Sequence, residues 1–212
     1  IAKKYFLPDV VARTVLSDED RQNGVALVDV GAGVTSVAIY HGGIMRSYAA
    51  IPFGGKTITG DIRTECSISE DLAEKIKVKF GACMPGKLAS LSEKVLQIRL
   101  TEPYKEVSVK YISEIIDARC RELIDALLYY IQESGLENNL RSGIVLTGGG
   151  ASLVNFANLF KEISGYEVRI GFPRHLFSAS VGTGIYDPSA TSAIGMVLAA
   201  KDDRMPDCIP RP

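Results

Sequence analysis

The stretch Val25–Ser36, VALVDVGAGVTS, places a short run of β-branched residues directly before a glycine-containing turn and a second apolar run. An apolar run of this kind, bounded by glycines, predicts a buried strand over Val25–Val30. The segments Ser36–Tyr40 and Ile44–Pro52 predict two further strands, with His41-Gly42-Gly43 as the turn between them. Because the turns are tight, we expect the three strands to form an antiparallel meander.

The first glycine turn, Asp29 to Thr35, has the residue types of a polyphosphate site. Glycines let backbone N–H groups form a concavity that a ligand can approach closely, since they have no Cβ and tolerate positive φ. The carboxylate of Asp29 can hold Mg²⁺ through water, and Thr35 offers a hydroxyl. A hairpin whose glycines serve only turn geometry is the alternative. A dinucleotide fingerprint is not present, because a strand follows where a helix would be needed.

A second glycine turn, Thr147–Gly150, follows the predicted strand Gly143–Thr147 and precedes a helix predicted over about Leu153–Ile163. Close backbone approach beside a helix N-terminus predicts an anion or nucleotide site. The alternative is a flexible strand–helix connector, which explains less, because three consecutive glycines cost conformational entropy and add no packing.

From Gly54 onward the hydrophobic period changes from two to about 3.6. It predicts a helix over Ser69–Phe80, capped by Ser67 or Ser69 and ended by Gly81. Glu74 and Lys77 are three residues apart on this helix, so they share a face and are able to pinch a ribose. A solvated charge pair is the alternative.

Other patterns complete the expected organisation of the chain. We expect the following: a helical segment before a solvated turn at 17–23, a turn at Pro85-Gly86, a strand at Val95–Leu100, the longest helix from about Ile112 to Ile131, a strand at Val168–Ile170, a loop through Pro173 and Pro188, and a small-residue helix at Ser192–Ala200. The proline-containing tail, 201–212, is predicted to be disordered.

Composition excludes several classes of function. The 212 residues carry a net charge of −1, which gives no bulk attraction to nucleic acid or to a membrane surface. No apolar run approaches the roughly 18 residues of a membrane span, and no signal peptide is visible. Four widely spaced cysteines and two histidines predict reduced cytosolic thiols and no zinc site. Because the chain opens with Ile1, we expect it to be a piece of a longer protein.

Four segments in this order, DVGAGVTS, IPFGGKTITGDI, AEKIKVKFG and IVLTGGGA, resemble the actin/Hsp70/sugar-kinase ATPase superfamily. The resemblance is closest to the bacterial cell-division family FtsA and covers about residues 20–200. It implies an α/β fold: an actin-like ATPase (ribonuclease H-like) subdomain with an inserted second α/β subdomain, together the C-terminal half of an FtsA protein. Subdomain 2A would comprise 1–66 and 142–200, and subdomain 2B would comprise 67–141.

The same resemblance implies a site for ATP and Mg²⁺. Asp29, Gly31, Ala32, Gly33, Val34 and Thr35 would form the second phosphate loop, with Mg²⁺ near Asp29 through water. Glu74 and Lys77 would contact ribose and base, and Gly148, Gly149 and Gly150 would form the adenosine motif. Arg119 matches a position at which the family binds the acidic C-terminal tail of FtsZ. An ordinary solvated cation is the alternative for Arg119.

The function implied is that of a filament-forming, ATP-binding adaptor that links the FtsZ ring to the membrane and recruits division proteins. Its place would be the cytoplasmic face of the membrane at the division site, with membrane contact only through segments absent here. Where the family has Gly, Thr and Asp, this chain has Ala32, Val34 and Ser36, which favours binding over hydrolysis and leaves no confident catalytic residue. Nothing resembles the first phosphate loop, so we expect weak nucleotide affinity. A kinase-type or chaperone-type ATPase half, or another actin-like scaffold, is the alternative.

Overall fold

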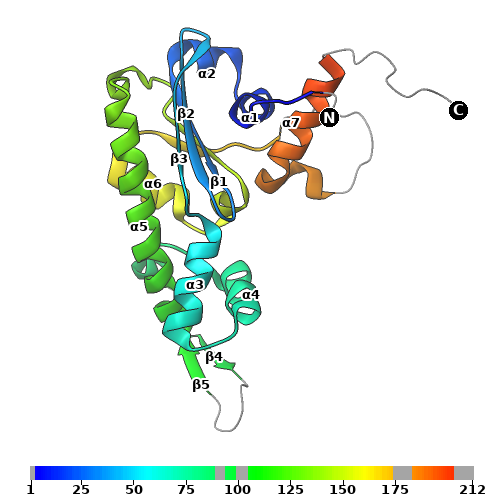
Figure 1. The fold of residues 1–212 in the computed structure, drawn as a ribbon. Coiled ribbons are helices and arrows are strands. Elements are labelled where there is room, and N and C mark those ends of the chain that lie inside the picture. The colour runs from blue at the N-terminus through cyan, green and yellow to red at the C-terminus, as the bar shows by residue number, and fades with distance from the viewer. Residues whose placement is uncertain (1–2, 89–93, 99–104, 174–182, 203–212) are drawn as a thin grey trace, which may run out of the picture.

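A five-stranded mixed sheet forms the centre of the chain (Figure 1). The computed structural model describes residues 3–88, 94–98, 105–173 and 183–202. The sheet has the order β3-β2-β1-β6-β7, with these bounds: β1 Val25–Val30, β2 Thr35–His41, β3 Ile44–Ile51, β6 Ile144–Thr147 and β7 Val168–Ile170. A separate two-stranded sheet consists of β4 Val95–Ile98 and β5 Lys105–Ser108.

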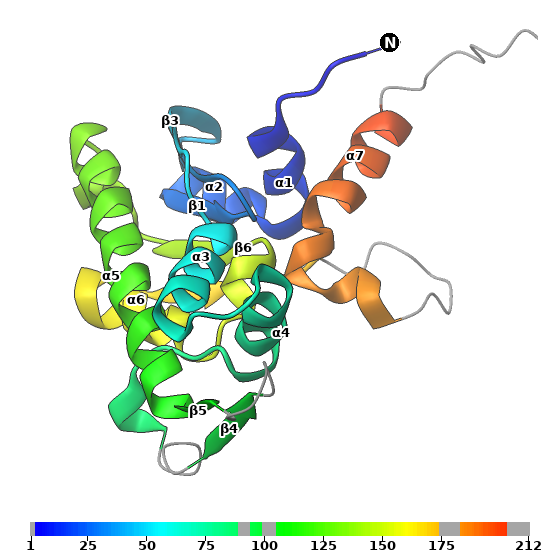
Figure 2. The same cartoon turned by 60° about the horizontal axis from the view of Figure 1, so that its bottom comes forward.

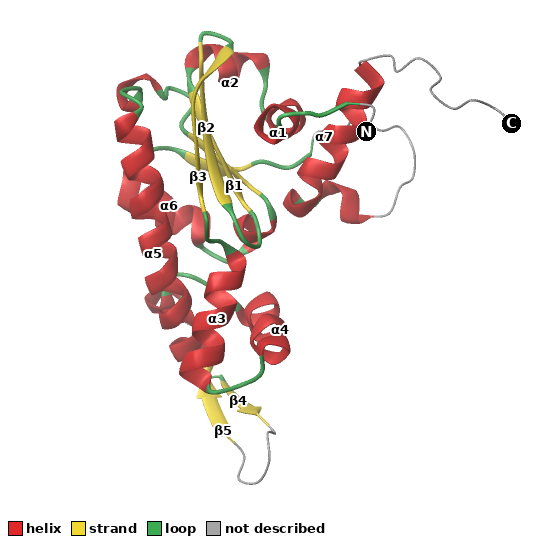
Figure 3. Cartoon of the chain, in the orientation of Figure 1, coloured by secondary structure: helices red, strands yellow, loops and turns green. Residues whose placement is uncertain are grey.

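Seven α-helices surround these sheets in the described part of the chain, as Figure 3 shows in red. Their bounds are α1 Leu7–Val15, α2 Asp18–Asn23, α3 Gly55–Cys66, α4 Glu70–Phe80, α5 Val109–Glu133, α6 Phe156–Ser164 and α7 Thr191–Asp202. Short 3₁₀ helices lie at Pro85–Lys87, Glu137–Asn139, Gly149–Ser152, Thr183–Tyr186 and Pro188–Ala190. None of the described helices is long and apolar enough to cross a bilayer.

The strand connections bring the two glycine turns to the same edge of the sheet. β1, β2 and β3 form the predicted antiparallel meander, which is confirmed. β6 runs parallel to β1, with Asp29 opposite Thr147 at the end of the pair. Because parallel strands end at the same edge, the turn after β1 and the turn after β6 lie side by side.

Alternating side chains give the sheet two buried faces. Val28, Val37 and Leu146 face a core formed with α5 and α6, whereas Leu27 and Val145 face α1. Figure 2 shows α5 and α6 on one side of the sheet and α1 on the other. Burial on both faces explains why β1 and β6 are continuous apolar runs. The fold is therefore a layered α/β arrangement, as predicted.

The last helix, α7, packs directly against the first. A Cβ at Gly195 would lie 2.7 Å from Val10 Cγ1 and 2.8 Å from Thr14 Oγ1, so only glycine allows this close approach. Thr14 Oγ1 also hydrogen-bonds to Thr191 O at 3.3 Å. The two ends of the described chain therefore meet on the α1 side of the sheet (Figure 1).

The longest helix, α5, extends from the sheet past α3 to the β4–β5 sheet (Figure 1). The guanidinium of Arg119 joins α5 to α3, since its Nε and NH2 atoms lie 2.7 and 3.0 Å from the two carboxylate oxygens of Asp61. Buried Asp117 joins α5 to the segment after α4 by accepting a 2.7 Å hydrogen bond from Met84 N. These bonds hold α3 and the segment after α4 against α5.

One local prediction is wrong, one helix was not predicted, and one helix begins later than predicted. Residues 17–23, expected as a solvated turn, contain helix α2, because Ser17 and Asp20 form a reciprocal capping box that stabilises its first turn. The sequence patterns assign no element to residues 55–66, which form α3. The second glycine turn leads first into the 3₁₀ helix Gly149–Ser152, and α6 begins at Phe156, three residues later than predicted, after Asn155 in the left-handed conformation.

Most other predicted elements are confirmed within one to three residues. Helix α4 is capped by Ser69, whose side chain accepts a hydrogen bond from Leu72 N. Strand β5 is not indicated by any sequence pattern. Part of the loop after Pro173 (174–182) and most of the tail (203–212) lie outside the described residues, while Lys201 and Asp202 end α7. Cys66, Cys83 and Cys120 are buried, and no disulfide joins them in the described part of the chain.

Candidate functional site: a pocket between two glycine turns

The first glycine turn has a series of backbone N–H groups that no described residue accepts from. Gly31 N donates to Val34 O at 3.0 Å, which closes the turn between β1 and β2. The N–H groups of Ala32, Gly33 and Val34 make no hydrogen bond to any described residue, and these three residues are exposed. Successive free N–H groups in a turn form an anion-binding concavity.

The second glycine turn packs against the end of β1. Gly148 has φ +81°, and a Cβ there would overlap Asp29 Oδ1 and lie 2.6 Å from Val30 O. A Cβ at Gly150 would lie 3.0 Å from Val30 Cβ. Gly149 has open space, its nearest neighbour being Ser189 Cβ at 3.8 Å. Two of the three glycines are therefore required by close approach, and the third is free for a ligand.

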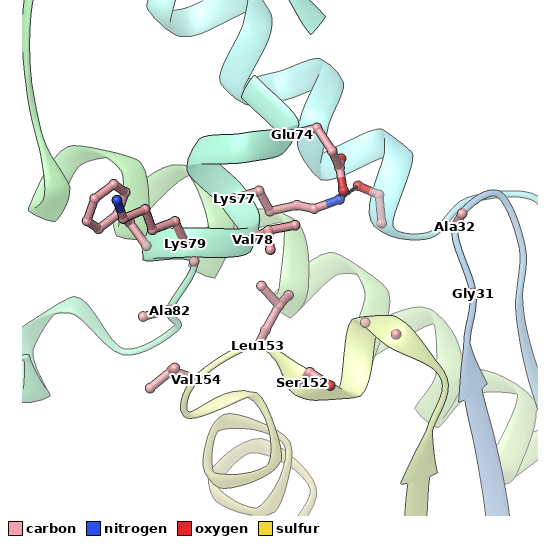
Figure 4. A pocket seen from close by; sticks show the side chains of 15 residues that line it. Gly31, Ala32, Glu74, Lys77, Val78, Lys79, Ala82, Ser152, Leu153 and Val154 are labelled. Carbon is pink, nitrogen blue, oxygen red and sulfur yellow. Dashed lines mark hydrogen bonds and ion pairs between the residues drawn. The ribbon is translucent and has the colours of Figure 1, made fainter. Parts of the chain in front are cut away.

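A pocket of about 360 Å³ lies between these turns and helix α4 (Figure 4). Its glycine-rich end is formed by Gly31, Ala32, Gly55, Gly149 and Gly150. Its other lining residues come from α4 and from the segments after α4 and after the second turn: Glu74, Lys77, Val78, Lys79, Phe80, Gly81, Ala82, Ser152, Leu153 and Val154. The pocket therefore has a polar end rich in backbone and a largely apolar end.

The structure brings together predicted residues from all three motifs. Gly31 and Ala32 of the first turn, Glu74 and Lys77 of α4, and Gly149 and Gly150 of the second turn all line the pocket. Five predicted residues do not line it: Asp29, Gly33, Val34, Thr35 and Gly148. The methyl group of Ala32, a departure from the family pattern, borders the pocket directly.

Asp29 lies in β1, two residues before the turn, and is paired with β2 on one side and β6 on the other. It is partly buried, and burial raises the pKa of its carboxyl above the ordinary value. Ser36 and Thr147 are its cross-strand neighbours, and no described residue donates a hydrogen bond to its carboxylate. A buried carboxylate without a donor fits a cation or a bound water better than it fits a purely structural role.

Thr35 is placed differently from its expected role. Its side chain is fully buried, and its hydroxyl has no hydrogen-bond partner among the described residues. It starts β2, opposite Val30 and Ile51, whose side chains belong to the apolar core. The hydroxyl is therefore in the protein interior and not at the surface of the turn.

Glu74 and Lys77 form a dense polar network with the first turns of α3. Lys77 Nζ donates to Glu74 Oε2 at 2.7 Å and to Thr59 Oγ1 and Gly55 O at 2.9 Å. Thr59 Oγ1 in turn contacts Glu74 Oε2. Burial acts to raise the pKa of Glu74, but hydrogen bonds from Lys77 and Thr59 hold it below the ordinary value. Glu74 is therefore ionised at neutral pH.

Sequence reasoning missed Gly55, Thr59 and the apolar end of the pocket. The sequence signal for Gly55 was the Gly54-Gly55 pair directly before a segment of helical length. The structure explains the pair's first glycine, because a Cβ at Gly54 would overlap Gly31 O. Val154 and Ala82 form an isolated parallel bridge that joins the two walls of the apolar end. No local pattern announces that bridge, because its two residues are far apart in the sequence.

Arg119 lies away from the pocket, on α5. Besides Asp61, its guanidinium pairs with Glu122 Oε2 at 2.6 Å, and hydrogen bonding to Asp61 raises its pKa despite partial burial. Only 30% of the side chain is exposed. It is therefore an intramolecular link, and its expected contact with an acidic tail stays a prediction.

The comparisons with known proteins give one family. The family model described as "Cell division protein FtsA" matches residues 26–195, which include both glycine turns and the whole of α3 to α6. This chain belongs to the FtsA family. FtsA of Borreliella burgdorferi is 39% identical over 184 residues, covering 86% of this chain and 44% of the relative. The chain spans less than half the length of the curated FtsA relatives that it matches.

Solved structures give the fold of this FtsA-family chain. MreB5 of Spiroplasma citri bound to ADP superposes with a TM-score of 0.73 at 19% identity, over 92% of this chain and 58% of that one. The double helical filament of MamK superposes with a TM-score of 0.66 at 17% identity, over 92% and 58%. The predicted actin-like fold is confirmed, and the family match favours FtsA over a kinase-type half.

Because Gly148 lies close to β1 and Gly149 does not, we expect alanine to be tolerated at Gly149 but not at Gly148. Gly148→Ala places a methyl group against Asp29 and Val30 in a left-handed backbone, so we expect the free energy of unfolding to fall by about 2 kcal/mol. Gly149→Ala is the matched control and should change it by less than about 0.5 kcal/mol. Urea denaturation measures both, and equal losses at the two positions would contradict the proposed packing.

The buried hydroxyl of Thr35 predicts a stabilising substitution. Thr35→Val removes an unpaired polar group at nearly constant volume, so we expect the free energy of unfolding to rise by about 1 kcal/mol. Thr59→Val is the control, because it removes a hydroxyl that is hydrogen-bonded and should lower stability by about 1 kcal/mol or more. Denaturant unfolding compares the two. A loss of stability in Thr35→Val would show that the hydroxyl has a partner.

Proposed function

We propose that this chain is the nucleotide-binding part of an actin-like, filament-forming adaptor of cell division. The observation that carries the proposal is the pocket in which both glycine turns and Glu74 converge. Its N–H-rich end suits phosphates, its ionised carboxylate suits ribose hydroxyls, and its apolar end suits a base. MreB5, whose structure contains ADP, shares the fold and supports ATP as the ligand class.

Mg²⁺ would accompany the nucleotide, held by Asp29 through water. The described residues contain no cluster of three or more His, Cys, Asp or Glu side chains that could hold a metal. The carboxylate of Asp29 alone therefore suits an ion that keeps most of its water and is held mainly by phosphate oxygens. Bound Mg²⁺ would screen the phosphate charge, while Asp29 orients water beside the turn.

The adaptor role follows from the family. We propose that the whole protein binds ATP as a structural ligand, assembles into filaments as MamK does, binds the FtsZ tail, and recruits division proteins at the cytoplasmic face of the membrane. Hydrolysis is not expected from this chain, because Ser36 replaces the family's second aspartate opposite Asp29. The division into subdomain 2A (1–66, 142–200) and subdomain 2B (67–141) stays a prediction.

Asp29 should link magnesium, nucleotide and pH. Because its folded-state pKa is raised, the folded state holds its proton longer than the unfolded state. The free energy of unfolding without ligand should therefore fall as pH rises through that pKa. Asp29→Asn removes this slope, so the variant should be more stable than the parent near neutral pH. Urea unfolding between about pH 4 and pH 7 measures this difference.

Magnesium nucleotide should make the parent more stable than Asp29→Asn, the reverse of the order expected without ligand. ATP with Mg²⁺ at about 100 times its Kd should add about 2.7 kcal/mol to the parent, and ATP with chelator should add less. Asp29→Asn should lose the difference between these two conditions. Equal stabilisation of parent and variant by magnesium nucleotide would exclude Asp29 from the metal site. No stabilisation of the parent at millimolar ATP would exclude nucleotide binding by this chain with a Kd of about a millimolar or lower.

The FtsZ tail gives a separate test at Arg119. An FtsZ C-terminal peptide should bind with micromolar-scale affinity, and Arg119→Glu should weaken it at least about tenfold. Arg121→Glu reverses a charge two residues away on α5 and serves as the matched control. Fluorescence anisotropy with labelled peptide measures affinity, and circular dichroism verifies folding. Equal affinity of Arg119→Glu and the parent would leave the Asp61 pair as the role of Arg119.

A further inference from the structure

The ammonium group of Lys77 has no donor left for a ligand. A lysine carries three N–H donors, and Lys77 Nζ uses them on Glu74 Oε2, Thr59 Oγ1 and Gly55 O, at 2.7, 2.9 and 2.9 Å. Only 11% of its side chain is exposed. Figure 4 shows it directed along the pocket wall toward α3, with its nitrogen at the polar network. Direct contact of this group with a nucleotide would require one of these bonds to break.

The acceptors of Lys77 belong to the helix that supports the first glycine turn. At the start of α3, Gly55 N donates to Gly31 O at 3.0 Å and Lys56 N donates to Ala32 O at 2.7 Å. Lys77 therefore holds the carbonyl of Gly55. The N–H groups of Gly55 and Lys56 hold the carbonyls of Gly31 and Ala32 in the turn. With those carbonyls directed to α3, the N–H groups of Ala32 and Gly33 are left for an anion.

Glu74 differs from Lys77 in having capacity to spare. Its described hydrogen bonds all use Oε2, and 46% of its side chain is exposed. The other oxygen can accept a hydroxyl without disturbing the network. Glu74 can therefore accept a hydrogen bond from a ligand, whereas Lys77 has no donor left for one, although both lie on the same face of α4.

We propose that Lys77 is a positioning residue: it acts through α3 to hold the first glycine turn in the shape that receives phosphate, while Glu74 alone of the pair contacts the ligand. The proposal rests on the nucleotide function proposed above. It assigns the two members of the pair to opposite ends of the ligand. Lys77 governs affinity for the phosphates, and Glu74 governs affinity for the ribose hydroxyls.

The first test needs no nucleotide. In Lys77→Met, amide hydrogen exchange followed by NMR should be at least about tenfold faster at Gly55 and Lys56, because the opening free energy of the start of α3 falls. Lys75→Met is the matched control, an exposed lysine on the same helix, and should leave both amides unchanged. Unchanged exchange in Lys77→Met would overturn the proposal. If Lys77→Met does not fold, Lys77→Gln keeps two of the three N–H donors on a shorter side chain and should give a smaller increase.

The second test separates the two ends of the ligand. Calorimetry with inorganic triphosphate, ATP and 2′,3′-dideoxy-ATP should show Lys77→Met weakening all three by a similar factor of about ten. Glu74→Gln should weaken ATP alone. A Lys77→Met variant that binds triphosphate normally but no longer distinguishes ATP from the dideoxy compound would overturn the proposal. If the parent binds none of the three, the nucleotide function fails, and amide exchange alone decides the role of Lys77.

Discussion

The site depends on how closely backbone can approach backbone where β1 ends. Gly148 lies against Asp29 and Val30, and Gly54 lies against the carbonyl of Gly31, at separations that admit no Cβ. These contacts bring the backbone of three segments, the turn after β6, the end of β1 with its turn, and the start of α3, into direct contact. Burial of the sheet on both faces supplies the free energy that holds them there. Gly148 and Gly54 are therefore required by packing, whether or not a ligand is bound.

The sequence predicted best where one local cause determines the structure. The meander and β6 follow from short apolar runs between glycines, and α4 begins directly after Ser69 because that side chain caps it. Helix α3 was missed because polar residues and glycines outnumber its apolar residues, and because its start is set by hydrogen bonds to the first glycine turn. Strand β5 was missed because it has only four residues, three of them polar, and so carries almost no periodic signal.

The candidate site divides in the same way. Motif order identified Gly31, Gly149 and Gly150 among the glycines that line the pocket, and helical spacing placed Glu74 and Lys77 on one face. Spacing could not tell which of the two is available, because that depends on Thr59 and Gly55, which lie on a different helix. It also could not tell that Thr35 points inward, since alternation fixes the face of a strand residue only once the register is known.

Polar links across the pocket suggest why its parts would respond together. The segment after the second glycine turn is joined to the segment after α4 by the bridge between Ala82 and Val154. Lys77 joins α4 to the start of α3, which is itself bonded to the first turn. Helix α5 holds both connections by its bonds to Met84 and Asp61. An anion on the first turn would stabilise the N–H groups that face it and, through the opposite carbonyls, the start of α3.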